Sequence, residues 1–418
     1  MHRNTHSRAD GGSVETPCAI SAGLYELYYG IHCTIFPMDW QEEIPRDEIC
    51  AIVLCALYGY YVFHTPNWSV NKLFLLTLGV FFFYLVYSLA IQCNSKAGIV
   101  TDFIIQIKPY LAFFTVYAFK PVLNETMKRN LRLLAVLFSI YLLGVGITVP
   151  FTSKILDALL HHESRLATAA TIMALLYLYC SNYTLKDKVI FLLILSIGLL
   201  SGRSKIYGFF VLATFVVFYV NGSFELKFNK KNVVLFSLAS VAVLIAAWSK
   251  INFYFIEGGI GNPRDAYDYY ARAALYFFSV DIFKDYFPFG SGFATYATFA
   301  SGQYYSHIYN DYGMDIMHGL NERHPDFIAD TYYPALAQFG VVGLFLFFAF
   351  WGILTKKALI NFSKVNLKDF TINILIILFF LIECTSDATI THNRGLFMMM
   401  LLALSLNSQY KSKQANKV

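Results

Sequence analysis

The amino-acid sequence predicts an all-α polytopic membrane protein with about twelve transmembrane helices and one large loop outside the membrane. Three observations lead to this fold class. Hydrophobic residues make up 57% and charged residues 14% of the 418 positions, which is too apolar for an ordinary soluble protein. Apolar runs about as long as a membrane-spanning helix recur along most of the chain. One long polar segment, residues 250–333, interrupts them.

The apolar runs define eleven expected spans and a weaker twelfth. A helix that crosses the hydrocarbon core needs about 20 residues, within a range of about 17 to 25. The weaker run, residues 17–37, contains Glu26 and His32 and would also suit an interfacial helix, in which case eleven spans remain. The eleven are residues 48–64, 70–92, 101–119, 131–150, 165–181, 187–202, 204–220, 232–249, 334–355, 369–384 and 394–408.

The distribution of positive charge predicts the orientation of these spans. Lys and Arg in short loops mark the cytoplasmic side of a membrane. With twelve spans, nineteen of the 32 Lys and Arg fall on the side of the two termini, and seven fall in short segments on the other side. We therefore expect cytoplasmic tails at residues 1–16 and 409–418, a helix bundle at 17–249, an outer loop at 250–333 and further spans at 334–408. No signal peptide is expected, because no cleavage site follows a short apolar core.

Charge and cysteine patterns exclude two other classes of function. The net charge is +5, but the basic residues lie in short loops between apolar runs, so we expect no nucleic-acid partner. The seven cysteines are scattered, mostly within apolar segments, and show no spacing typical of a metal site or a disulfide framework. No Asp-x-Asp pattern occurs in the chain, so neither a metal nor another cofactor is expected.

The outer loop at residues 250–333 is the expected place for chemistry. It holds ten Asp and Glu and thirteen Tyr, which favours a surface that faces sugars or other polar ligands. An amphipathic helix is expected at residues 263–287, because Asn262 suits an N-cap and Pro263 suits the first helical position. Arg272 lies on this helix in apolar surroundings.

A second helix is expected to begin near Pro325, at the end of the loop. Asp326 and Asp330 would then share one face directly above the membrane, and Pro334 would kink the helix where it enters the bilayer. Asp326 also suits a role as a partner of the helix dipole, which Asp330 suits less well.

Other ionisable residues lie at the same membrane level in separate segments. Arg203 and Lys205 occupy a tight outer turn between two spans, and Arg394 lies at the end of the last outer loop. Lys108 lies inside the span 101–119, where a charge costs about 3 kcal/mol on insertion scales and therefore marks a candidate functional site. Snorkelling of a long side chain at a helix end is the alternative for Arg203, Lys205 and Lys108.

Three stretches carry a resemblance to a known family. The first is the outer turn Ser201-Gly202-Arg203-Ser204, and the second runs from Ala271-Arg272-Ala273 to Pro288-Phe289-Gly290-Ser291-Gly292-Phe293. The third runs from Asp330 to Phe339-Gly340-Val341-Val342-Gly343. With the order of spans, they resemble the O-antigen polymerase and O-antigen ligase superfamily of polytopic glycosyltransferases over roughly residues 48–408. The resemblance implies a GT-C-like fold.

One departure favours a Wzy-type repeat-unit polymerase over a ligase. The ligases carry His followed by Asn, Ser or Gln eleven residues before the glycine that corresponds to Gly340. This chain has Ala329-Asp330 there, and His324 lies sixteen residues before Gly340.

The resemblance implies transfer of a growing glycan from undecaprenyl diphosphate to a sugar hydroxyl of the next lipid-linked repeat unit. The product would be O-antigen or capsular polysaccharide, made at the bacterial inner membrane. The implied partners are the undecaprenyl-diphosphate-linked oligosaccharide as donor and acceptor, membrane lipid and a chain-length regulator protein. Two alternatives stay open: a ligase that transfers polymer to lipid A-core, and a flippase for lipid-linked oligosaccharides.

This chemistry needs fixed cations, a base and sugar-binding surfaces. The leaving diphosphate is anionic, and Arg binds phosphate oxygens bidentately. A carboxylate or imidazole would accept the proton of the attacking hydroxyl, and aromatic rings stack on sugars or pack at the membrane interface. The candidates are Arg203 and Arg272, then Lys205, Arg323, Arg394 and Lys108, for the diphosphate; Asp330 or His324 as the base; and Tyr304, Tyr305, Tyr309 and Tyr312 for the glycan.

Overall fold

The computed structural model describes residues 46–64, 68–121, 123–152, 154–220, 267–360, 362 and 367–415. The chain divides into two units, Met1–Ile52 and Val53–Val418. The described residues are mostly helical, and the only extended pairing among them is an isolated bridge between Asn321 and His324. The predicted tail at 1–16, the weak span at 17–37, the span at 232–249 and the expected cap Asn262-Pro263 lie outside the described residues.

Each of the other ten expected spans contains a helix. The agreement arises because the length of an apolar run and its flanking polar residues are local features of the sequence. The helices are α2 (Arg46–His64), α3 (Trp68–Ile91), α4 (Lys96–Phe119), α5 (Glu125–Thr148), α7 (Glu163–Cys180), α8 (Leu185–Ile197), α9 (Ser204–Tyr219), α14 (Gly340–Ile360), α15 (Leu367–Glu383) and α16 (Asn393–Ala415).

Fewer of these helices are long and apolar enough to cross a membrane. Four segments meet both conditions among the described residues: Lys72–Ile91, Lys96–Phe119, Glu125–Thr148 and Pro334–Ile360. Val53–Phe63 and Ser204–Tyr219 are apolar but shorter. The chain is therefore a helical protein with several helices suited to a membrane, and the prediction of twelve spans is not confirmed.

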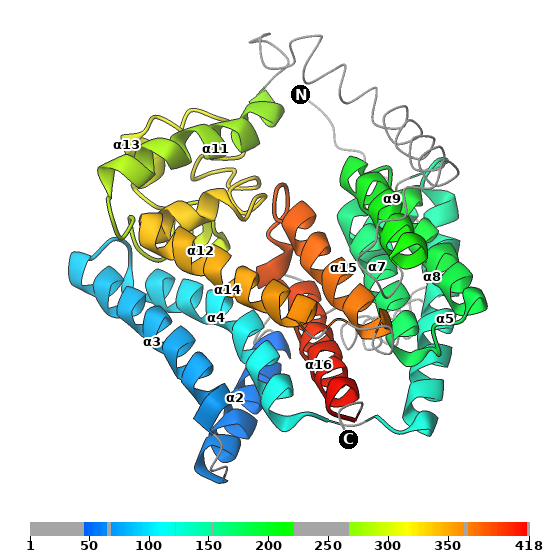
Figure 1. Ribbon diagram of the computed structural model, residues 1–418. Coiled ribbons are helices and arrows are strands. Elements are labelled where there is room, and N and C mark those ends of the chain that lie inside the picture. Colours follow the sequence, from blue (N-terminus) through cyan, green and yellow to red (C-terminus); the bar gives the residue numbers. More distant parts are fainter. Residues whose placement is uncertain are drawn as a thin grey trace, which may run out of the picture. The chain divides into compact units, whose positions relative to one another are not determined.

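The described helices of the second unit pack in two connected groups. Helices α3, α4, α14, α15 and α16 form one group, in which α4 packs against the sequence-distant α16, and α5, α7, α8 and α9 form a second set of neighbours (Figure 1). Contacts of α7 with α16 and of α9 with α15 join the two groups. The last helix, α16, continues to Ala415, so it includes residues that were expected to form the start of the C-terminal tail.

The described part of the outer loop has its own hydrophobic core. Its helices are α11 (Tyr267–Asp285), α12 (Phe299–Gln303) and α13 (Ile308–Asp311), and a further short helix, α6 (Lys154–Leu160), lies in another connecting segment. Leu275 and Ile282 of α11 are fully buried together with Tyr296 and Tyr309. The abundant tyrosines of the loop therefore serve partly as core residues.

Two local predictions for this loop need correction. The amphipathic helix expected at 263–287 is α11, but it ends at Asp285 and residues 286–289 form turns. No α-helix begins near Pro325: residues 325–332 are turns and bends, and a short 3-10 helix, η3 (Pro334–Phe339), follows. Pro334 begins η3 and does not kink a longer helix, because proline suits the first turn of a helix, where its missing N–H is not needed.

Two glycine turns fasten the loop to the start of α14. Val342 N donates to Pro288 O at 3.3 Å, and Gly292 N donates to Gln338 O at 2.8 Å. Gly290 and Gly340 have positive φ angles of 81° and 60°, and a Cβ on either one would collide with the backbone of the other. Only glycine permits both this backbone conformation and this approach.

The C-terminal end of α3 and the N-terminal half of α4 hold the same loop from another side. Tyr87 Oη donates to Gly290 O at 2.9 Å, and Phe293 N donates to Ser88 Oγ at 2.8 Å. The buried Asp102 carboxylate accepts from Ala294 N at 2.7 Å. Side chains of α3 and α4 thus fix the loop to the helix bundle through hydrogen bonds to the backbone of the loop.

We expect Gly290→Ala to reduce the stability of the folded protein more than Gly313→Ala does. Both glycines have a positive φ angle, but a Cβ at position 313 meets no atom within 4 Å, whereas at position 290 it would lie 2.5 Å from Ala337 O. The strain of the φ angle alone costs about 1 kcal/mol at position 313, and the added collision at position 290 should raise the cost to about 3 kcal/mol.

The measurement is thermal unfolding of both purified variants in detergent, with the parent protein beside them. Equal shifts in melting temperature for the two variants would contradict the role given to the contact between Gly290 and Gly340.

Candidate functional site

A half-buried ion pair joins two of the predicted site residues. Arg272, on α11, donates from Nε to Asp330 Oδ2 at 2.8 Å, and its Nη2 bonds to the same oxygen. The Arg272 side chain is 36% exposed and that of Asp330 is 30% exposed, so solvent reaches both. Burial raises the pKa of the Asp330 carboxyl above its ordinary value, while the Arg272 guanidinium opposes this effect.

A second group of charges is more deeply buried. Lys205 Nζ lies 2.7 Å from Glu383 Oε1 and 3.8 Å from Asp387 Oδ2, and Arg394 Nη2 lies 3.4 Å from Asp387 Oδ1. Their side chains are between 7% and 12% exposed, and the group holds two cations and two carboxylates. Burial raises the pKa of Asp387, but Arg394 and Lys205 outweigh it and hold this pKa well below its usual range.

Arg203 is positioned by the N-terminus of α7. Its Nη2 lies 2.6 Å from His162 Nε2, and its Nε lies 3.3 Å from Glu163 Oε2. His162 is the N-cap of α7, and its ring accepts from Ser164 N at 3.3 Å. Burial and the charge of Arg203 lower the pKa of His162 to about 4, so the ring is neutral near pH 7 and only one of its two nitrogens accepts a hydrogen bond.

These groups form one electrostatic unit, called here the polar cluster: Arg203, Lys205, Arg272, Asp330, Glu383, Asp387 and Arg394. Besides Arg272, both Asp387 and Arg203 act on the charge of the Asp330 carboxyl. The members come from α9 and the turn before it, α11, the end of the outer loop, the last residue of α15, the segment that links α15 to α16, and the first turn of α16. Segments far apart in sequence thus bring four cations together.

Lys108 lies on α4, which contacts the short 3-10 helix η4 (Thr389–Thr391) between α15 and α16. Lys108 is buried, 7% exposed, and directly precedes Pro109 within α4. His392, in the segment between α15 and α16, has a pKa of about 4 because of burial and the charge of Arg394, with smaller contributions from Arg165 and Lys108.

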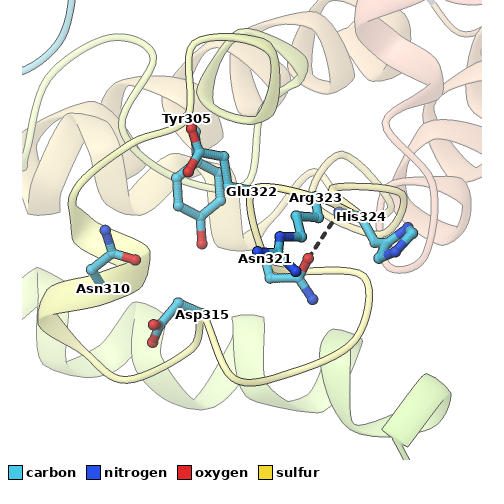
Figure 2. A pocket seen from close by; sticks show the side chains of 7 residues that line it. All are labelled: Tyr305, Asn310, Asp315, Asn321, Glu322, Arg323 and His324. Carbon is cyan, nitrogen blue, oxygen red and sulfur yellow. Dashed lines mark hydrogen bonds between the residues drawn. The ribbon is translucent and has the colours of Figure 1, made fainter.

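Arg323 and His324 belong to a different part of the loop. They line an open pocket of about 480 Å³ together with Tyr305, Asn310, Asp315, Asn321 and Glu322 (Figure 2). His324 N donates to Asn321 Oδ1 at 2.8 Å, which orders the turn at the rim of this pocket. Among the described residues, no hydrogen bond or ion pair connects Arg323 or His324 with the polar cluster.

Between the two candidate bases, the arrangement favours Asp330, because Asp330 pairs with Arg272 whereas His324 lies in the separate pocket.

The four tyrosines predicted to bind glycan have different surroundings. Tyr309 is fully buried, its Oη accepts from Ala297 N at 2.8 Å, and its ring belongs to the core of the loop, so that prediction is corrected. Tyr304 packs over Gly98, and Tyr312 Oη donates to Asp285 Oδ2 at 2.6 Å. Tyr305 lines the pocket, and burial, Asp315 and Glu322 raise its pKa to about 12. The rings of Tyr304, Tyr305 and Tyr312 are only partly buried.

Sequence reasoning missed His162 and Glu163, the residues that orient Arg203. Both lie in a short connecting segment forty residues before the Arg203 turn. The available signal was the series His161-His162-Glu163, polar residues placed directly ahead of an apolar helix. Within the described residues, no three side chains of His, Cys, Asp or Glu are arranged to hold a metal ion.

Comparisons of the chain with protein-family models, with curated proteins and with solved structures found no match.

We expect Lys205→Met to destabilise the protein strongly and the double variant Lys205→Met/Glu383→Gln to recover part of the loss. The single variant leaves buried carboxylates without their cation, which costs about 3–5 kcal/mol. The double variant also removes the Glu383 carboxylate, which the single variant leaves buried without its cation. Thermal unfolding in detergent measures both.

The matched control is Lys128→Met, which breaks the exposed pair of Lys128 and Glu125, with an N–O distance of 2.8 Å. This surface pair should contribute less than about 1 kcal/mol. A double variant no more stable than Lys205→Met would argue against direct pairing of Lys205 with Glu383.

Proposed function

We propose that the protein is a membrane-embedded glycosyltransferase that polymerises lipid-linked oligosaccharide repeat units of O-antigen or capsular polysaccharide. The growing glycan would pass from undecaprenyl diphosphate to a sugar hydroxyl of the next undecaprenyl-diphosphate-linked unit. The observation that carries the proposal is the convergence of Arg203, Lys205, Arg272 and Arg394 around Asp330 and Asp387. A doubly or triply charged diphosphate needs several fixed cations of this kind.

The solvent-exposed ion pair of Arg272 and Asp330 supports one specific step: when substrate binds, a diphosphate oxygen would replace Asp330 as the partner of Arg272. A diphosphate oxygen competes with Asp330 for the planar Arg272 guanidinium, which binds phosphate bidentately. Loss of that cation would raise the pKa of Asp330 further and make it a better base. Arg203, held by the neutral His162, would supply the second cation for the diphosphate.

The transfer balances with these groups alone. The bond between the anomeric carbon and the diphosphate oxygen breaks, and its electron pair stays on the diphosphate. The acceptor hydroxyl oxygen forms the new bond to the anomeric carbon, and its proton passes to Asp330. A diphosphate bound to cations is a weak base, so its departure needs no proton donor.

The proposal also includes the arrangement in the membrane. The outer loop and the polar cluster would face the periplasm, and both termini would face the cytoplasm of a bacterial cell, as the bias of Lys and Arg predicts. We also propose twelve spans, a GT-C-like fold and a chain-length regulator protein as a partner.

Deletion of the gene in its host distinguishes the polymerase from its alternatives. A strain that lacks a polymerase should carry single repeat units in place of a ladder of surface polysaccharide on a gel. Intact lipid-linked polymer without surface transfer would favour a ligase. Single repeat units retained on the cytoplasmic side would favour a flippase.

We expect Arg272→Ala and Arg203→Ala to abolish the polysaccharide ladder, with a loss of activity of at least about a hundredfold for each. Both variants remove a cation that would stabilise the leaving diphosphate. Complementation of the deletion strain, with protein in the membrane fraction measured by immunoblot, provides the test. Arg323→Ala is the control of the same residue type, because Arg323 lines the separate pocket. A full ladder with Arg272→Ala would remove Arg272 from the diphosphate site.

The pH dependence of transfer should report Asp330. A base must be deprotonated, so activity falls as pH decreases through its pKa, which burial raises above the ordinary value of 3.8. Because Arg272 lowers this pKa, Arg272→Gln should move the acidic limb of kcat/KM to higher pH. The assay uses purified enzyme in nanodiscs with lipid-linked repeat units. An unchanged limb in Arg272→Gln would exclude Asp330 as the titrating base.

A further inference from the structure

Helix α11 exposes apolar side chains on one face. Tyr276, Phe277 and Val280 are exposed along the helix, and Phe287 is exposed in the turn that follows it. Phe277 and Phe287 are each 69% exposed, which is unusual for two phenylalanines on one short segment. Spacings of three and four residues place Tyr276, Phe277 and Val280 on one side of the helix. This side, with Phe287 in the turn that follows, is called here the apolar face of α11.

The opposite side of α11 already has a partner. Ala271, Leu275 and Ile282 are fully buried in the core of the outer loop, where they lie with Tyr296 and Met314. The helix is therefore apolar on two sides, and only one of them is covered by the described residues of the second unit. A second apolar environment is needed for the other side.

The place of α11 in the fold indicates what that environment is. The helix contacts η3 and α14, which together form the candidate span Pro334–Ile360 (Figure 1). The side of α14 formed by Val341, Phe345 and Phe348 is also exposed and apolar, as expected of a surface in contact with lipid. Helix α11 therefore lies beside the N-terminal end of a helix that is long and apolar enough to cross a membrane.

Polar groups near α11 suit the boundary between lipid and water. Tyr276 Oη donates to Thr385 O at 2.7 Å, and Tyr333 Oη donates to Leu381 O at 3.0 Å. Tyrosines gather at this depth of a membrane because one end of the side chain is apolar and the other is polar. Lys284, exposed near the end of α11, pairs with Asp281 at an N–O distance of 3.0 Å, an exposed ion pair that suits the water side of this boundary.

We propose that α11 lies in the headgroup layer of the outer leaflet, with its apolar face in contact with acyl chains. Arg272, near the first turn of the same helix, is then held at the level of lipid phosphate groups. The occupant of the apolar face is the bilayer itself, and the proposal does not depend on which reaction the protein catalyses.

Lipid contact can be measured directly in nanodiscs. Phe277→Cys and Val280→Cys are labelled with the fluorophore NBD, and lipids with a nitroxide on carbon 5 of the acyl chain act as quenchers. We expect blue-shifted emission and at least about twofold stronger quenching than for Glu322→Cys, an exposed position on the rim of the pocket. The unmodified protein, labelled in parallel, corrects for native cysteines such as the exposed Cys55.

A second variant tests whether positions 277 and 280 contact lipid together. Phe277→Asp combined with the label at position 280 should reduce the quenching there by about half, because a charge at this depth weakens insertion of the helix. Glycan transfer is not part of either readout, so failure here is separate from failure of the proposed function.

Two outcomes would overturn the proposal. Emission typical of water at positions 277 and 280 would show that the apolar face is solvated. Blue-shifted emission without quenching by the lipid nitroxide would show that a protein surface, and not the bilayer, covers it.

Discussion

The backbone contact between the turn at Gly290 and the start of α14 at Gly340 is the constraint on which the site depends. Asp330 lies ten residues before Gly340, and Arg272 lies eighteen residues before Gly290. Both ends of the Arg272–Asp330 pair are therefore tied, over short lengths of chain, to one fixed point. Only glycine fits at that point. Gly290 and Gly340, which belong to two of the stretches that carry the family resemblance, therefore have a structural role.

The charges of the polar cluster differ in what they can do. Lys205, Glu383, Asp387 and Arg394 are almost completely buried and balance one another, so this part is stable without a ligand. The pair formed with Asp330 is reached by solvent and can exchange one partner for an incoming anion. This combination of a buried, charge-balanced group with one solvent-exposed ion pair would suit the proposed binding of a diphosphate, since only that ion pair must open.

The outer loop combines a compact core with surfaces of opposite character. Tyr309 and its neighbours make the loop a folded unit on top of the helices, and the pocket around Tyr305 opens to water. The apolar face of α11 points to a different environment. With lipid on one side and water on another, the loop would hold Arg272 where a lipid-linked sugar changes from its acyl part to its polar part.

The sequence by itself determined the helical class, the positions of ten helices, and the main cations of the site. Apolar run length, helix caps and charges at helix ends are local properties, so Arg203, Lys205, Arg272 and Arg394 were identifiable without a fold. Only the tertiary structure decided their partners. It joined Arg203 to His162 and placed His324 in a separate pocket. The reason is that such pairings depend on how distant helices pack, which no local pattern of residues encodes.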